Sequence, residues 1–257
     1  RGNGVSAVVE GSGMLVMTLF LSREMIAGRL TPESMEELGR SEAGRAEKLK
    51  ASPPLLQRAL LAPYLLGQAF ILRGDVSRIQ LGAQGADFDR LFRDPPVSSE
   101  QLLHPEKYWD DAKRDLPREV KLPDLCGTLG AGWSQAGRGD LGEMNLAILT
   151  SPGAIDPLSP EATQPAAWTN EAAAGWGGDR WSLCAAGDRH VTILATLWDT
   201  PADAAQFDLA LPAMEGRRVT RRGDAVVLVA GDAPERAGSL AAAALKALEP
   251  PPADSSR

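Results

Sequence analysis

The chain has 257 residues, of which 44% are hydrophobic and 24% charged, and its formal net charge is −7. This length and composition are ordinary for a soluble globular protein with a substantial core in one or two domains. The acidic balance argues against a general nucleic-acid-binding protein, which would carry a basic face. The tightest basic cluster, in residues 217–222, is interpreted as the solvated face of one hairpin.

Two cysteines and two histidines limit the metal and redox chemistry of this chain. Cys126 and Cys184 could form one disulfide or remain two buried thiols, and neither belongs to a CxxC pair. His104 and His190 lie far apart in the sequence, and the zinc-binding motif HExxH is absent. A zinc site built from these residues alone is therefore not expected.

The N-terminal sequence favours neither a membrane span nor a signal peptide. The most apolar run, residues 14–21, is shorter than the roughly 18 apolar residues of a spanning helix. Residues 1–4 contain no initiator Met and begin no signal-peptide pattern. We therefore expect no membrane span, and we expect the chain to be a processed product or an excised part of a longer protein.

The N-terminal half is predicted to be helical, with a Leu-rich core. Thr31 and Pro32 are suited to the N-cap and first position of a helix, and Pro63 should kink the helix that contains it. Helices are predicted at Val5–Ala27, Thr31–Lys50, Pro54–Leu72 and Ala86–Arg93.

Glu10 lies in an otherwise apolar turn of the first predicted helix and is followed by Gly11 and Gly13. Each glycine costs about 1 kcal/mol relative to alanine in a helix interior, and such glycines usually let another backbone or a ligand come close. A carboxylate in apolar surroundings needs a cation, a metal or hydrogen-bond donors. The alternative interpretation is a glutamate near a helix end that faces water.

The densest run of special residues is Asp94–Tyr108, with the sequence DPPVSSEQLLHPEKY. Ser98 or Ser99 is predicted to cap a short helix that contains Glu100 and Gln101. In the simpler interpretation this run is a capped turn in which the polar side chains of Ser98, Glu100 and Gln101 fix the backbone.

His104 lies at the predicted end of this short helix, because the residue before Pro105 is pushed away from the helical region. Its neighbours Glu106, Lys107 and Tyr108 are all polar or ionisable. We expect His104 to face a cleft, and the run to lie between the helical half and the rest of the chain.

The C-terminal part is predicted to contain a smaller antiparallel sheet in the order ββαββα, so the whole chain is expected to be α+β. Gly-Asp pairs at residues 187–188 and 223–224 are hairpin signals. Residues 118–122 and 126–135 are predicted to be short strands or extended loops. Strands are expected at Arg180–Ala185, Val191–Trp198, Arg217–Arg222 and Ala225–Ala230, and helices at Leu141–Thr150, Pro201–Ala213 and Glu235–Leu248.

A change in composition after Tyr108 sets the predicted domain boundaries. Residues 1–115 are expected to form the helical part, and residues 116–249 the α+β part. The tail, residues 250–257, has nothing to bury and is predicted to be disordered.

The run GWGGDR at residues 175–180 is predicted to be a ligand-binding turn or a tight corner between the end of a helix, Asn170–Ala174, and a strand. Asp179 and Arg180 could form an internal ion pair. Trp176, Trp198 and Asp199 are interpreted as core and corner residues rather than catalytic ones.

Three separated regions carry recognisable motifs: VVEG at residues 8–11, PPVSSEQLLHPEKY at 95–108, and AAGWGGDR at 173–180 followed by LWDT and AAQF. Together they resemble the LVEG, STEQxLHPEKY, GWGGDR and WDT signatures of an uncharacterised family of bacterial zincin-like metallopeptidases. The matches follow the order of the family's motifs and cover most of residues 5–210. Each match is weak alone, and the three in order are fairly specific.

The resemblance implies a zinc hydrolase in which HExxH supplies two histidines and the general base, and a downstream helix supplies a glutamate ligand. Glu10 matches that glutamate. HExxH would lie before Arg1, and His104 and His190 cannot replace it because they are not an i, i+4 pair. Zinc is therefore expected in the complete protein, whereas this chain alone holds one ligand of the set and is expected to be inactive.

Two hypotheses follow from the resemblance. In the first, the chain is the C-terminal portion of a peptidase and pairs with its own upstream segment, with Glu10 as a metal ligand and His104 or Tyr108 stabilising the oxyanion. In the second, it is a non-catalytic pseudo-peptidase or a module that binds a protein or peptide. The two cysteines and the family's exported character favour an extracytoplasmic location, either secreted, periplasmic or as a lipoprotein.

Overall fold

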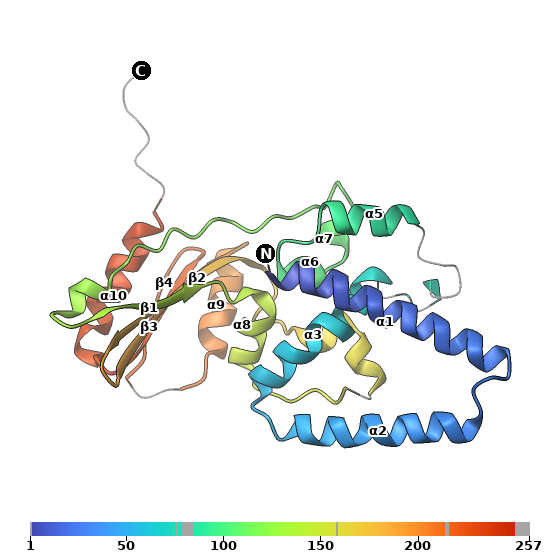
Figure 1. Cartoon of the computed structure of the whole chain (residues 1–257). Coiled ribbons are helices and arrows are strands. Elements are labelled where there is room, and N and C mark those ends of the chain that lie inside the picture. The colour runs from blue at the N-terminus through green and yellow to red at the C-terminus, as the bar shows by residue number, and fades with distance from the viewer. Residues whose placement is uncertain are drawn as a thin grey trace. The chain divides into compact units, whose positions relative to one another are not determined.

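The computed structural model describes residues 2–73, 75, 77–78, 85–157, 159–213 and 216–249. The chain divides into two compact units, the first made of residues 1–116 and 143–170 and the second of residues 117–142 and 171–257. The α+β class is confirmed, because helices dominate the N-terminal half and the C-terminal part holds a five-stranded antiparallel sheet (Figure 1). The predicted boundary after residue 115 lies next to a unit boundary, but residues 143–170 return to the first unit.

Two helices of the first unit begin at the predicted caps. The Thr31 hydroxyl accepts the N–H of Ser34 as the N-cap of α2, and the Ser98 hydroxyl accepts the N–H of Gln101 as the N-cap of α6. The described helices up to residue 150 are α1 (Gly2–Ile26), α2 (Pro32–Lys50), α3 (Pro54–Ile71), α5 (Gly85–Arg93), α6 (Ser99–Leu103), α7 (Glu106–Trp109) and α8 (Gly142–Thr150). Two 3₁₀ turns follow at Pro160–Thr163 and Pro165–Trp168.

Helices α1 and α3 pack against each other (Figure 1), and two glycines lie where their backbones come closest. A Cβ atom on Gly11 would lie 2.8 Å from the Cα atom of Gly67, and a Cβ on Gly67 would collide with the carbonyl of Ala7. The predicted close approach of a second backbone is therefore confirmed at Gly11. At Gly13 a Cβ would meet nothing within 4 Å, so Gly11 and Gly13 have different surroundings.

By length and composition alone, the stretch Gly4–Ile26 of α1 could cross a membrane. The core helix of a soluble protein and a signal sequence meet the same criterion, so the absence of a membrane span stays a prediction. One side of α1 is buried against the unit through residues such as Ala7, Val8 and Leu15. The other side exposes large apolar side chains, among them Met17 and Phe20.

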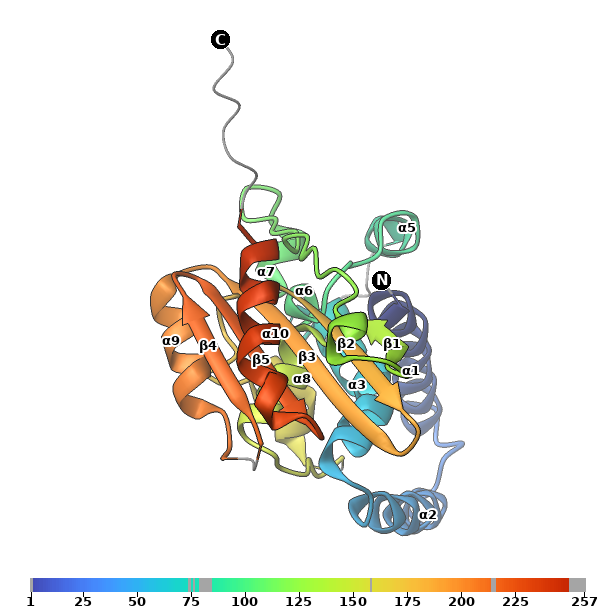
Figure 2. The same cartoon turned by 90° about the vertical axis from the view of Figure 1, so that its left-hand side faces the viewer.

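The sheet of the second unit has the strand order β1-β2-β3-β5-β4, and all neighbouring pairs are antiparallel (Figure 2). Both predicted hairpins are confirmed, with turns at residues 187–188 and 223–224. The predicted disordered tail, residues 250–257, lies outside the described residues. The strands are β1 (Ser134–Gly139), β2 (Trp176–Ala186), β3 (Arg189–Trp198), β4 (Arg218–Arg222) and β5 (Ala225–Gly231), and the helices that follow β3 and β5 are α9 (Pro201–Ala210) and α10 (Pro234–Ala247).

Helices α9 and α10 contact side chains that alternate along β3. Ile193 and its alternate neighbours join the core that contains Leu240 of α10, whereas Trp198 lies 4.6 Å from the ring of Phe207 of α9. Since successive residues of a strand point to opposite faces, the two helices cover opposite faces of the sheet. Trp198 is fully buried, which confirms its predicted place in the core.

Strand β2 begins at Trp176, four residues earlier than predicted, with a bulge between Trp176 and Gly178. Residues 171–175 form a turn rather than a helix end, so the predicted corner between a helix and a strand is wrong. Gly178 permits a close contact with the backbone of Arg118, because a Cβ on Gly178 would lie 3.2 Å from the carbonyl carbon of Arg118. Glycine here therefore lets the extended residues 117–122 lie against β2, where the N–H of Arg118 bonds the carbonyl of Gly177 at 2.6 Å.

A disulfide joins Cys126, in a 3₁₀ turn at Cys126–Leu129, to Cys184 in β2. The sequence had left this pair open between a disulfide and two thiols. The bond closes a separation of 58 residues, and both cysteines are fully buried. The disulfide links the segment before β1 covalently to strand β2.

Replacing both cysteines by alanine is expected to lower the free energy of unfolding of the second unit by about 4 kcal/mol, because the unfolded chain regains the entropy of a long loop. Urea unfolding followed by tryptophan fluorescence measures this decrease in the free energy of unfolding. Reduction of the native protein with dithiothreitol should lower the free energy of unfolding by the same amount. Equal midpoints for the oxidised native protein and the double variant would show that the bond does not stabilise this fold.

Candidate functional site

The segment before α7 is fixed by polar side chains, as the simpler interpretation expected. The side-chain oxygen of Gln101 accepts the N–H of Val97 at 2.9 Å, and its amide nitrogen donates to the carbonyl of Asp115 at 2.6 Å. Together with the Ser98 cap these contacts hold both sides of α6. Ser98 and Gln101 therefore have the predicted role of fixing the backbone.

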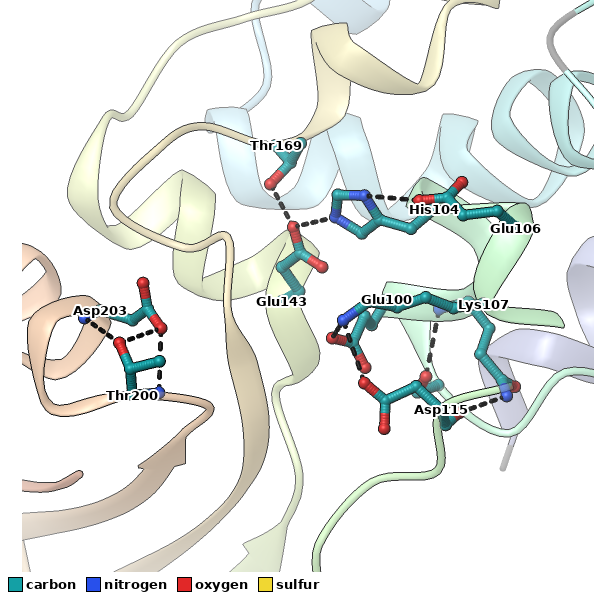
Figure 3. Close-up of polar contacts among 11 residues, drawn as sticks. Glu100, His104, Glu106, Lys107, Asp115, Glu143, Thr169, Thr200 and Asp203 are labelled. Carbon is teal, nitrogen blue, oxygen red and sulfur yellow. Dashed lines mark hydrogen bonds and ion pairs between the residues drawn. The ribbon is translucent and has the colours of Figure 1, made fainter. Parts of the chain in front are cut away.

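Glu100 binds a side chain rather than the backbone. Its carboxylate lies 2.6 Å from the Nζ of Lys107, which also contacts the carboxylate of Asp115 at 3.1 Å (Figure 3). Glu100 is 1% exposed, and this burial raises its pKa to about 7, although the Lys107 ammonium opposes the shift. Burial alone would lower the pKa of Lys107, but its hydrogen bond to Glu100 raises it. The ion pair between Glu100 and Lys107 stabilises the turn that carries His104.

His104 forms a hydrogen-bonded pair with Glu143, the second residue of α8 (Figure 3). The imidazole Nε2 lies 3.0 Å from Oε1 of Glu143, and the hydroxyl of Thr169 donates to the same oxygen. Its Nδ1 is 3.9 Å from the half-exposed carboxylate of Glu106. The hydrogen bond to Glu143 raises the pKa of His104, while burial of the ring opposes the shift. The structure therefore favours the charged imidazolium at this position.

Glu143 is the functional candidate that the sequence did not reveal. Its side chain is fully buried, and its second oxygen, Oε2, has no hydrogen-bond partner within the described part of the chain. Glu143 is the charged residue of a largely apolar helical run, LGEMNLAILT, and that contrast was the available signal. Its partner His104 lies 39 residues away, so local pattern could not link the two.

Tyr108 does not have the surroundings of a catalytic group. Its side chain is fully buried, and its hydroxyl donates to the carbonyl of Asp94 at 2.7 Å. The ring packs edge-on against Phe70 and Trp109. The predicted catalytic role of Tyr108 is therefore not supported, and the side chain serves the core of the first unit.

Glu10 is half-buried on α1, on the side of the helix that also carries Gly13 and Met17 at spacings of three and seven residues. The space beside Gly13 is open, and Met17 is 47% exposed. Among the described residues no hydrogen bond, ion pair or group of three metal-ligating side chains includes Glu10. Within the described part of the chain, therefore, no group of metal-ligating side chains forms around Glu10.

The predicted site residues of the second unit bond to the protein backbone or lie in its core. Asp179 is 4% exposed and accepts the N–H groups of Leu141 at 2.6 Å and Gly142 at 2.8 Å, together with the indole N–H of Trp176 at 3.0 Å. Burial raises the pKa of Asp179, and these donors oppose the shift. Trp176 is thereby a core residue, as predicted.

The predicted Asp179–Arg180 pair is wrong. Neighbouring residues of β2 point to opposite faces of the sheet, and Arg180 instead contacts Asp140, with its Nη1 3.1 Å from the carboxylate. Asp199 follows the end of β3 and is exposed, and its N–H donates to the carbonyl of Gly175 at 2.7 Å. Asp199 is therefore a corner residue, as predicted.

Comparison with protein families finds a match in the second unit. Residues 132–233, which include the five strands of the sheet, match the model of a family described as a domain of unknown function (DUF8575). Neither the curated proteins nor the solved structures contain a match to the chain. The similarity covers less than half of the chain, and it lies downstream of both Glu10 and His104.

Proposed function

We propose that the chain is the C-terminal part of a zinc-dependent peptidase-like protein, in which Glu10 is one metal ligand. The observation that carries the proposal is the setting of Glu10, a half-buried carboxylate on an apolar helix with no protein partner among the described residues. Carboxylate oxygen is a normal zinc ligand, and catalytic zinc sites use three protein ligands. The other two ligands and the general base would come from an upstream HExxH helix.

The surface around Glu10 supports the approach of a further helix. Gly13 leaves open space one turn along α1, and Met17 and Phe20 expose apolar surface on the following turns. Gly11, on the other side of α1, is closed by α3. A helix packed on the open side would cover exposed apolar area, which favours association, and would place its ligands next to Glu10.

His104 is the proposed electrophile of the same unit. Nε2 is held by Glu143, so Nδ1 is the nitrogen left to donate to a developing oxyanion. Glu143 is then a positioning residue, because it orients the ring and favours its charge without touching substrate. Glu106, 3.9 Å from Nδ1, is half-exposed and competes weakly for that donor.

The second candidate is a non-catalytic module that binds a protein or peptide. The observation that favours it is the lack of HExxH in a chain with two histidines, since these residues alone cannot complete the zinc site. Both candidates fit an extracytoplasmic location, because a buried disulfide persists in oxidising compartments.

Casein cleavage by the gene product that includes the residues upstream of Arg1 separates the two candidates. We expect cleavage that 1,10-phenanthroline abolishes and that Glu10→Gln reduces by more than about 100-fold, since even outer-shell partners of a metal contribute 10–100-fold. Glu24→Gln, on the same helix and paired with Arg29, should retain activity. Chelator-sensitive cleavage by residues 1–257 alone would overturn the proposal, and a longer product without zinc or activity would favour the binding module.

A further inference from the structure

A cavity of about 420 Å³ lies in the second unit, between residues 119–123, strands β1 and β2, and the end of α10 at Ala247. Three of its lining side chains are cationic, Lys121, Arg138 and Arg180, and one is acidic, Glu119. The chain as a whole carries a charge of −7, so this concentration of positive charge is local. All of the lining residues belong to one compact unit.

Arg180 has an unsatisfied hydrogen-bond donor in this cavity wall. Its side chain is 27% exposed and its Nη1 contacts Asp140 at 3.1 Å, but its Nε is buried and has no hydrogen-bond partner within the described residues. A buried donor without a partner is unfavourable, so the Arg180 guanidinium has hydrogen-bonding capacity that the described residues do not use.

Arg138 supplies a second guanidinium on the same side of the sheet. It pairs with Ser182 in the β1–β2 register, and Ser182 shares a face of β2 with Arg180 because they are two residues apart. No hydrogen bond or ion pair holds the Arg138 side chain among the described residues. Lys121 and Glu119 contact each other at 3.7 Å and are both exposed, so their pairing is weak.

We propose that this cavity binds a small oxyanion, with the guanidinium groups of Arg138 and Arg180 as its main contacts. Guanidinium groups match carboxylate and phosphate oxygens because they present several N–H donors in one plane. Lys121 adds a third positive charge, and Glu119 limits the net charge of the lining. The bound group is either a phosphate or a carboxylate of a small molecule, and the site is independent of the zinc proposal.

Titration of the full chain with inorganic phosphate and, separately, with acetate at constant ionic strength tests this site. Isothermal titration calorimetry should detect saturable binding of one or both anions. The anion that binds more tightly identifies the bound group as a phosphate or a carboxylate. Arg138→Gln should weaken binding by about tenfold or more, since it removes a charge-assisted contact. Arg180→Lys keeps the positive charge but loses the planar donors, and it should weaken binding as well.

Arg218→Gln is the matched control, because Arg218 is an exposed arginine on β4, at the opposite edge of the sheet. It should bind the anions as the native chain does. Circular dichroism establishes that each variant is folded before titration. Absence of saturable binding by the native chain, or equal weakening in all three variants, would overturn the proposal.

Discussion

Gly11→Ala is expected to destabilise the first unit, whereas Gly13→Ala, two residues further along the same helix, is expected to stabilise it. Alanine is favoured over glycine by about 1 kcal/mol in a helix interior, and Gly13 has open space for the added methyl group. At Gly11 the methyl group would lie 2.8 Å from the Cα of Gly67, so α1 and α3 must separate. We expect a net loss of about 3 kcal/mol or more, as for an overpacked core.

Thermal unfolding followed by circular dichroism at 222 nm compares the two variants. The native chain should melt between them, with Gly11→Ala lowest. Gly67→Ala, on the other side of the same contact, should behave like Gly11→Ala. A rise in the melting temperature of Gly11→Ala similar to that of Gly13→Ala would mean that α1 and α3 do not cross at these glycines.

Glu143→Gln is expected to lower the pKa of His104 and to remove stability mainly at acid pH. The folded-state pKa of His104 is raised by Glu143, so the pair stabilises fully below the unfolded histidine value of about 6.5 and loses this contribution as the pH rises through the folded value. The loss in Glu143→Gln should therefore be about 2 kcal/mol at pH 5.5 and smaller at pH 8.5.

The titration is easy to assign because the chain has two histidines. Proton NMR of the imidazole resonances gives both pKa values, and His190→Gln identifies the signal of His104. Glu106→Gln is the control, since Glu106 is half-exposed and 3.9 Å from the ring, while Lys107 opposes the charge of His104 in every variant. An unchanged His104 titration in Glu143→Gln would exclude the pair in solution.

Local chemistry predicted most of the fold. The caps at Thr31 and Ser98 and the two Gly-Asp turns predicted where two helices begin and where both hairpins turn, because each signal acts over a few residues. The predicted start of β2 was wrong because the glycines of GWGG are typical of a corner. Gly177 and Gly178 instead let residues 117–122 lie against the strand, a contact that depends on the tertiary fold.

The candidate site was less predictable, because its pairs join distant residues. His104 was singled out by its turn, but Glu143 follows it by 39 residues and lies in an ordinary apolar helix. The sequence also could not choose between a disulfide and two thiols for Cys126 and Cys184, since neither outcome leaves a local mark. Asp179 and Arg180 were wrongly predicted to pair because they are neighbours in the sequence. Neighbouring side chains of a strand point to opposite faces of the sheet and so do not meet.

The role of Glu10 is tested most directly by the zinc content of the gene product that includes the residues upstream of Arg1. Mass spectrometry of the purified, dialysed protein should find about one zinc ion per chain in the native sequence and in the Glu24→Gln control. Glu10→Gln should lose most of its zinc under the same dialysis. Stoichiometric zinc retained by Glu10→Gln, or no zinc in the native product, would contradict the assignment of Glu10 as a metal ligand.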